Sequence, residues 1–112
     1  MMSKSEARKT AAGFLYVNAA VSALSGLVSV IKGPRLAGLI KLGGAGTHVW
    51  AALEPSTERL QIASAVSAGL GVVDAATALR PGINGGQRVF RLGGAVFNGL
   101  TAVLHNEAAK DL

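Results

Sequence analysis

The chain has 112 residues, of which 50% are apolar and only 15% charged, with a further 15 glycines. Its mean hydropathy is +0.43, whereas a soluble domain carries about 25% charged residues. A small soluble domain needs proportionally more polar surface, so this composition argues against a water-facing exterior. It indicates an outer surface that faces lipid or other subunits. The absence of cysteine excludes disulfides and cysteine-based metal sites.

In chain order, the first apolar run, residues 11–31, is long enough to span a bilayer, which takes about 20 residues. More apolar runs follow, so we expect a retained helix rather than a cleaved signal peptide. The runs at residues 36–53 and 89–105 are marginal, because Lys41 and Arg91 lie near their starts. The run at residues 60–79 is again long enough.

The three prolines, Pro34, Pro55 and Pro81, each lie between two runs, as expected at helix ends. Ser56 or Thr57 is positioned to cap the third helix. The runs are rich in Ala, Leu and Gly without sustained alternation, so strands are not expected. We predict an all-α integral membrane protein, a single domain of four short transmembrane helices forming two tandem hairpins.

The hairpins resemble each other, residues 11–53 matching residues 60–105. The sequence AVSA at residues 20–23 recurs at residues 65–68, and KLGGA at residues 41–45 recurs as RLGGA at residues 91–95. Chance similarity in a chain rich in Ala, Gly and Leu is the alternative. The common order of the matches and the shared basic position favour an internal repeat.

Positive charge gathers at the first and third loops, while the termini and the second loop are balanced. The positive-inside rule then predicts that loops one and three face the cytoplasm, matrix or stroma. Basic side chains near helix ends can reach lipid headgroups, including anionic ones. The residues expected to do so are Lys32, Arg35, Lys41, Arg80, Arg88 and Arg91.

Small residues recur about every fourth position and give each helix a smooth face on which another helix can dock closely. The positions predicted to pack in this way are Ser22, Gly26, Gly43, Gly44, Ser67, Gly71, Gly93 and Gly94. The alternative is that Gly and Ala are simply common in membrane helices.

Asp74 and His48 are ionisable residues that lie in the interior of apolar runs, away from the starts where Lys41 and Arg91 lie. Asp74 is expected to pair with Arg80 or Arg88, with a proton-carrying role as the alternative. His48 is expected to hydrogen-bond to a Ser, a Thr or a carbonyl group. As a metal ligand it would need several converging partners, and His105 is the only other histidine.

No phosphate-binding loop, nucleophile elbow or paired-carboxylate arrangement is present. We therefore expect no enzyme activity, catalytic residue, cofactor, metal or small-molecule substrate. The net charge of +5 would suggest nucleic acid in a soluble protein. The basic residues are scattered and aromatic residues are few, so no nucleic-acid partner is expected.

The remaining features favour a structural accessory subunit whose partners are other membrane subunits and phospholipids. In size, charge and helix number the chain resembles small multi-span accessory subunits of mitochondrial ATP synthases and respiratory complexes, including those of green algae. No motif carries this resemblance, which implies a place in the mitochondrial inner membrane. One alternative is a small oligomeric transporter or channel lined by His48, Asp74 and Asn98. Another is a peripheral lipid-binding helical protein.

Overall fold

A computed structural model describes residues 3–112, which form four α-helices and no strand. The helices are α1 (Lys4–Lys32), α2 (Arg35–Leu53), α3 (Thr57–Ala78) and α4 (Gly85–Ala109). The all-α prediction is confirmed. The helices are linked by short segments, residues 33–34, 54–56 and 79–84.

Side-chain caps begin three of the helices. Ser3 accepts a hydrogen bond from the backbone N–H of Glu6, and Ser56 accepts one from that of Arg59, both at 3.2 Å. The Asn84 side chain caps α4 by accepting from the Gln87 N–H at 2.8 Å. The predicted cap at Ser56 is confirmed, because its oxygen meets an N–H that has no partner within the helix.

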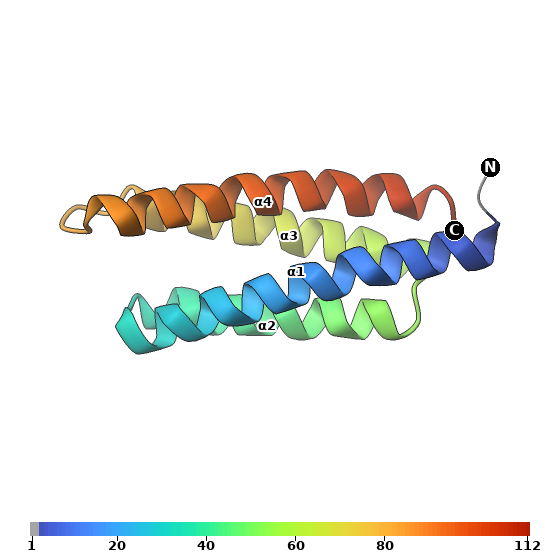
Figure 1. The fold of residues 1–112 in the computed structure, drawn as a ribbon, viewed down its shortest axis with the longest axis horizontal. Helices are drawn as coiled ribbons and strands as arrows, with labels where there is room; N and C mark the ends of the chain where they lie inside the picture. The colour runs from blue at the N-terminus through green and yellow to red at the C-terminus, as the bar shows by residue number, and fades with distance from the viewer. Residues whose placement is uncertain (1–2) are drawn as a thin grey trace.

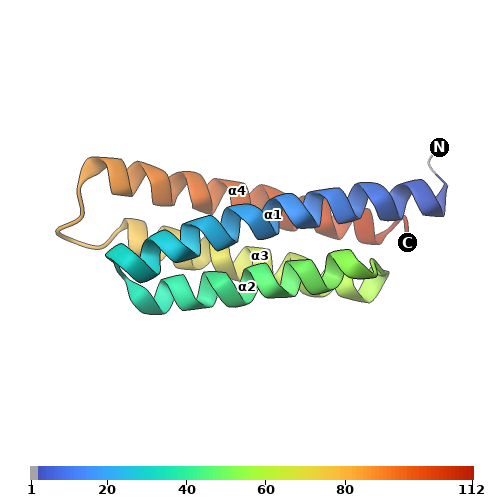
Figure 2. The same ribbon diagram turned by 60° about the horizontal axis from the view of Figure 1, so that its bottom comes forward.

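The helices run alternately up and down, and α1 packs mainly on α2 while α3 packs mainly on α4. Both ends of the described chain lie at one end of the bundle, and the α1–α2 and α3–α4 connections lie at the other (Figure 1). The molecule measures 49 × 20 × 18 Å. In both views α1 and α4 are close near the termini and diverge toward the opposite end (Figure 2).

Glycines allow close backbone approach within each hairpin. A Cβ atom on Gly26 would lie 2.9 Å from the Gly38 carbonyl oxygen, and one on Gly38 would lie 2.6 Å from that of Gly26. In the second hairpin a Cβ atom on Gly71 would lie 3.3 Å from the Ala95 carbonyl oxygen. Side chains larger than hydrogen would therefore push the paired helices apart.

The apolar core is small and occupies the end of the bundle near the termini. Leu15 of α1 and Leu60 of α3 are fully buried there. Mostly alanines surround them: Ala11, Ala51, Ala52, Ala63 and Ala109. Toward the opposite end the interior becomes polar.

Two of the four helices, α1 and α3, are long and apolar enough to cross a membrane. The prediction of four such helices is therefore supported for two. Polar side chains interrupt the apolar stretches of the other two helices, among them Lys41 and His48 in α2 and Arg91 and Asn98 in α4. These residues lower the apolar character of α2 and α4, although α4 is longer than its apolar run.

Candidate functional site

The bundle has polar side chains inside and large apolar side chains outside. Polar or charged residues buried in the interior are Asn18, Ser22, Ser29, Lys41, His48, Ser67, Asp74, Arg91, Asn98, Thr101 and His105. In contrast, Leu24, Ile31 and Leu79 are 67%, 76% and 73% exposed. This distribution is the reverse of that in a soluble domain. It suits a surface that faces hydrocarbon or partner helices.

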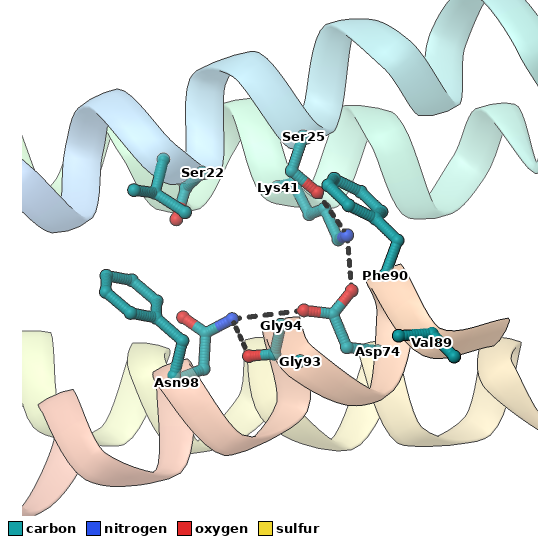
Figure 3. A pocket seen from close by; sticks show the side chains of 11 residues that line it. Ser22, Ser25, Lys41, Asp74, Val89, Phe90, Gly93, Gly94 and Asn98 are labelled. Atoms are coloured by element: carbon teal, nitrogen blue, oxygen red, sulfur yellow. Dashed lines mark hydrogen bonds and ion pairs between the residues drawn. The ribbon is translucent and has the colours of Figure 1, made fainter. Parts of the chain in front are cut away.

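An ion pair between Lys41 of α2 and Asp74 of α3 lies in the interior (Figure 3). Both side chains are only 2% exposed. The Lys41 ammonium group also donates to Ser25 Oγ at 2.6 Å, and Asp74 Oδ2 accepts from Asn98 Nδ2 at 3.1 Å. The two charges therefore sit among compensating partners contributed by all four helices.

This pairing differs from two sequence-based expectations. Asp74 was expected to pair with Arg80 or Arg88, but its partner is Lys41, because α2 and α3 are neighbours and bring the two residues to one level. Lys41 was expected to reach lipid headgroups, but its side chain points into the bundle, where it forms an ion pair with the Asp74 carboxylate. Burial beside an opposite charge replaces solvation at a helix end.

A hydrogen-bonded cluster joins all four helices at the next level. Asn18 of α1 donates through Nδ2 to Ser67 Oγ of α3 at 3.2 Å and to Thr101 Oγ1 of α4 at 2.6 Å. Ser67 Oγ lies 2.8 Å from Nε2 of His48 on α2. Ser22 Oγ donates to Asn18 Oδ1 at 3.1 Å. The cluster thus ties the two hairpins together through side chains.

The His48 ring has a defined orientation in this cluster. Its Nδ1 lies 2.7 Å from the Gly44 carbonyl oxygen, which can only accept, so Nδ1 carries a hydrogen. Ser67 accepts from Asn18 and has its own hydroxyl hydrogen free for His48 Nε2. The structure therefore agrees with the expected hydrogen bonds of His48 to a serine and a carbonyl group.

His105 lies beside His48, their ring centroids 5.3 Å apart. The sequence position of His105 near the end of α4 gave no hint of this, because the contact depends on α2 and α4 facing each other across the interior. In residues 3–112 no group of three or more His, Asp or Glu side chains is arranged to hold a metal ion.

Arg91 occupies the position in α4 that matches Lys41 in the proposed repeat. Its guanidinium donates to Thr77 Oγ1 at 3.2 Å and to the Gly33 carbonyl oxygen at 2.9 Å, and the residue is 6% exposed. It therefore links α4 to the α1–α2 connection instead of extending outward. The other four basic residues expected at headgroups, Lys32, Arg35, Arg80 and Arg88, are exposed.

The predicted packing positions divide into two sets. Ser22, Gly26, Gly44, Ser67 and Gly71 are buried between helices. A Cβ atom on Gly44 would lie 2.8 Å from Leu70, and one on Gly94 would lie 2.5 Å from Asp74 Oδ2.

Gly43 and Gly93 form the second set, Gly43 on the outer surface and Gly93 beside a cavity between α1 and α4. Both are exposed, and a Cβ atom added at either would meet nothing within 4 Å. These two glycines therefore do not mediate packing inside the chain.

Sequence reasoning missed Ser25 and Thr101 as interior residues, and it gave Asn18 and Asn98 no partners. A signal exists for Asn18. On α1 the polar residues Asn18, Ser22 and Ser29 recur at intervals of four and seven, which places them on one face of an otherwise apolar helix. Such a polar face in an apolar helix marks the side that turns toward the bundle interior.

No family model, curated protein or solved structure matches this chain. The function proposed below therefore rests on the geometry of the bundle.

Proposed function

We propose that this chain is a four-helix integral membrane protein that serves as a structural subunit of a larger membrane complex. The observation that supports this most directly is the inverted distribution of polarity, with ionic and hydrogen-bonding groups inside and leucine, isoleucine and valine outside. In water this exterior would promote aggregation, whereas in hydrocarbon it costs nothing.

The dimensions are compatible with this proposal. The bundle is 49 Å long, and a bilayer with its headgroups is about 40–45 Å thick. The exposed basic residues Lys32, Arg35, Arg80 and Arg88 lie next to the two connections at one end, where anionic headgroups would meet them.

The short connections, the interior hydrogen bonds and the exposed glycine surface favour a structural role. The connections between helices are short, and the interior polar groups mostly satisfy one another. Gly43 offers an outward-facing site where a helix of another subunit can approach closely. The specific form of the proposal, an accessory subunit of an energy-transducing complex in the mitochondrial inner membrane, rests on resemblance in build alone.

Two biochemical measurements test the proposal. Washing membranes with alkaline carbonate should leave the protein in the pellet, and its release would argue for a peripheral lipid-binding protein instead. Purification in a gentle detergent followed by mass spectrometry should recover other membrane proteins in fixed ratio. Recovery of this chain alone as a homo-oligomer would contradict the subunit role.

Outward-facing glycines provide a sharper test of docking. Gly43→Leu should reduce co-purification of the partner subunits, because it fills the space into which a partner helix would fit. Gly13→Leu is a matched control, since Gly13 is also exposed with nothing within 4 Å but lies outside the predicted packing positions. An equal loss for both variants, or no loss for either, would count against docking at Gly43.

A second candidate, a small oligomeric transporter or channel, is favoured by one observation. Polar side chains succeed one another along the bundle interior, from Arg91 through the Lys41–Asp74 pair to His48. In sealed vesicles containing the purified chain, the subunit proposal predicts no proton flux. A flux that the folded double variant Lys41→Met/Asp74→Asn loses would instead establish the transporter.

A further inference from the structure

A cavity of about 340 Å³ opens between α1 and α4, in the part of the bundle where these two helices diverge. Its walls are apolar and include Val21, Phe90 and Phe97, while Lys41, Asp74 and Asn98 contribute polar groups (Figure 3). The volume is in the range of small-molecule sites. The cavity is therefore large enough for a compact organic ligand.

The charge inside this cavity is balanced. Lys41 and Asp74 neutralise each other as an ion pair, and each has a further hydrogen-bond partner, Ser25 and Asn98 respectively. An ion entering the cavity would have to compete with an existing pair in a region of low dielectric constant. An uncharged occupant avoids this cost.

The Asn98 side chain has one unused acceptor. Its Nδ2 donates to Asp74 Oδ2 at 3.1 Å and to the Gly94 carbonyl oxygen at 3.0 Å. Both partners are acceptors, which fixes the amide orientation. Its Oδ1 has no hydrogen-bond partner within residues 3–112, although Asn98 is only 5% exposed. Figure 3 shows this oxygen turned away from Asp74, on the side where Ser22 lies.

A buried acceptor without a partner is costly, so a donor from outside the chain is the expected complement. Two phenylalanines that line the cavity, Phe90 and Phe97, lie two helical turns apart on the same face of α4. Aromatic walls favour an aromatic occupant, whose ring can pack against their edges or faces.

We propose that this cavity binds a small uncharged aromatic alcohol. Its hydroxyl group donates to Asn98 Oδ1, and its ring lies against Phe90 and Phe97. This binding role is additional to the structural role proposed above and does not depend on it. It departs from the sequence-based expectation that the chain has no small-molecule partner.

Photolabelling of the purified full chain in detergent tests the proposal. The probe is 4-hydroxybenzophenone, and 4-methoxybenzophenone, which lacks the donor hydrogen, is the control. Loss of one hydrogen bond of this kind should weaken labelling about tenfold. Mass spectrometry should locate the adducts of the hydroxyl probe in residues 21–25 and 89–98.

Two variants on the same helix make the test specific. Gly93 lies between Phe90 and Phe97 on the cavity face, so Gly93→Leu should fill the cavity and abolish the labelling difference between the probes. Gly99→Leu is the matched control, because Gly99 is also exposed with nothing within 4 Å and does not line the cavity. It should keep the difference intact.

A direct removal of the acceptor complements these variants. Asn98→Leu should bring labelling by the hydroxyl probe down to that of the methoxy probe, provided that thermal unfolding still shows a folded chain. The proposal is overturned if the two probes label the unaltered protein equally. It is also overturned if the adducts spread over the outer surface or if Gly93→Leu leaves the labelling unchanged.

Discussion

Lys41 and Asp74 belong to different hairpins, and their contact fixes the register of the two hairpins along the bundle axis. Apolar helix surfaces alone do not define such a register, because many sliding positions bury similar areas. A buried ionic contact has one satisfied arrangement, and every displacement leaves a charge without a partner. The Asn18–Ser67–His48 hydrogen bonds act in the same way at the next level.

Replacing both members of the ion pair should cost less stability than replacing either one alone. Lys41→Met or Asp74→Asn alone should lower the free energy of unfolding in detergent by about 3–5 kcal/mol, because each leaves an uncompensated buried charge. The double variant should recover to within about 1 kcal/mol of the unaltered chain. Additive losses would show that the two side chains do not interact.

The sequence pattern predicted well which residues face the bundle interior. It predicted less well which residues contact one another there. The spacing of Ser22, Gly26, Ser67 and Gly71 indicated a packing face, and these residues are buried. The partner of Asp74 was missed because it depends on which helices are neighbours. A nearby arginine in the same sequence segment is the obvious candidate, whereas the lysine actually used lies 33 positions away.

At the scale of elements, the caps explain why the helices differ in length from their apolar runs. Apolar residues indicate only the part of a helix suited to hydrocarbon. The helix itself continues until its backbone groups are capped, so α1 begins at Lys4 after Ser3 and α4 begins at Gly85 after Asn84. The polar first turns of both helices were therefore left out of the predicted ranges.

The first hairpin depends on the contact between Gly26 and Gly38. Gly38→Ala should destabilise the protein by about 1–3 kcal/mol, since the new methyl group would lie 2.6 Å from the Gly26 carbonyl oxygen and 2.7 Å from the Val30 nitrogen. Thermal unfolding of the purified variants measures the effect.

Gly43→Ala is the matched control on the same helix. It meets nothing within 4 Å and should leave stability equal or slightly higher, because alanine favours helix formation. Equal losses for Gly38→Ala and Gly43→Ala would mean that helix proximity is not what Gly38 provides.

At the scale of the whole molecule, the sequence predicted the number and order of the helices, and the composition indicated an apolar exterior. It did not indicate the cavity between α1 and α4. That space arises because α1 and α4 diverge while Gly93 and Gly94 contribute no side chains to fill the gap. How two helices far apart in sequence cross depends on how they pack. The periodicity of residues along a single helix does not predict this crossing.

The four-span topology can be tested with single cysteines, because the chain has none of its own. In sealed vesicles, an impermeant thiol reagent should distinguish Ile83→Cys, in the α3–α4 connection, from Glu54→Cys and Asp111→Cys, near the opposite end. The last two should react alike. Reaction of all three from the same side would exclude four crossings.

Both ends of the described chain lie at the same end of the bundle as the α2–α3 connection (Figure 1). A short linker joining residue 112 to residue 3 would therefore run alongside residues 54–56. A permuted chain in which residues 57–112 precede residues 3–53 would trace the same bundle. The three-dimensional arrangement of the helices therefore does not depend on which hairpin comes first in the sequence. The same would hold for a protein made by fusing two hairpin units end to end.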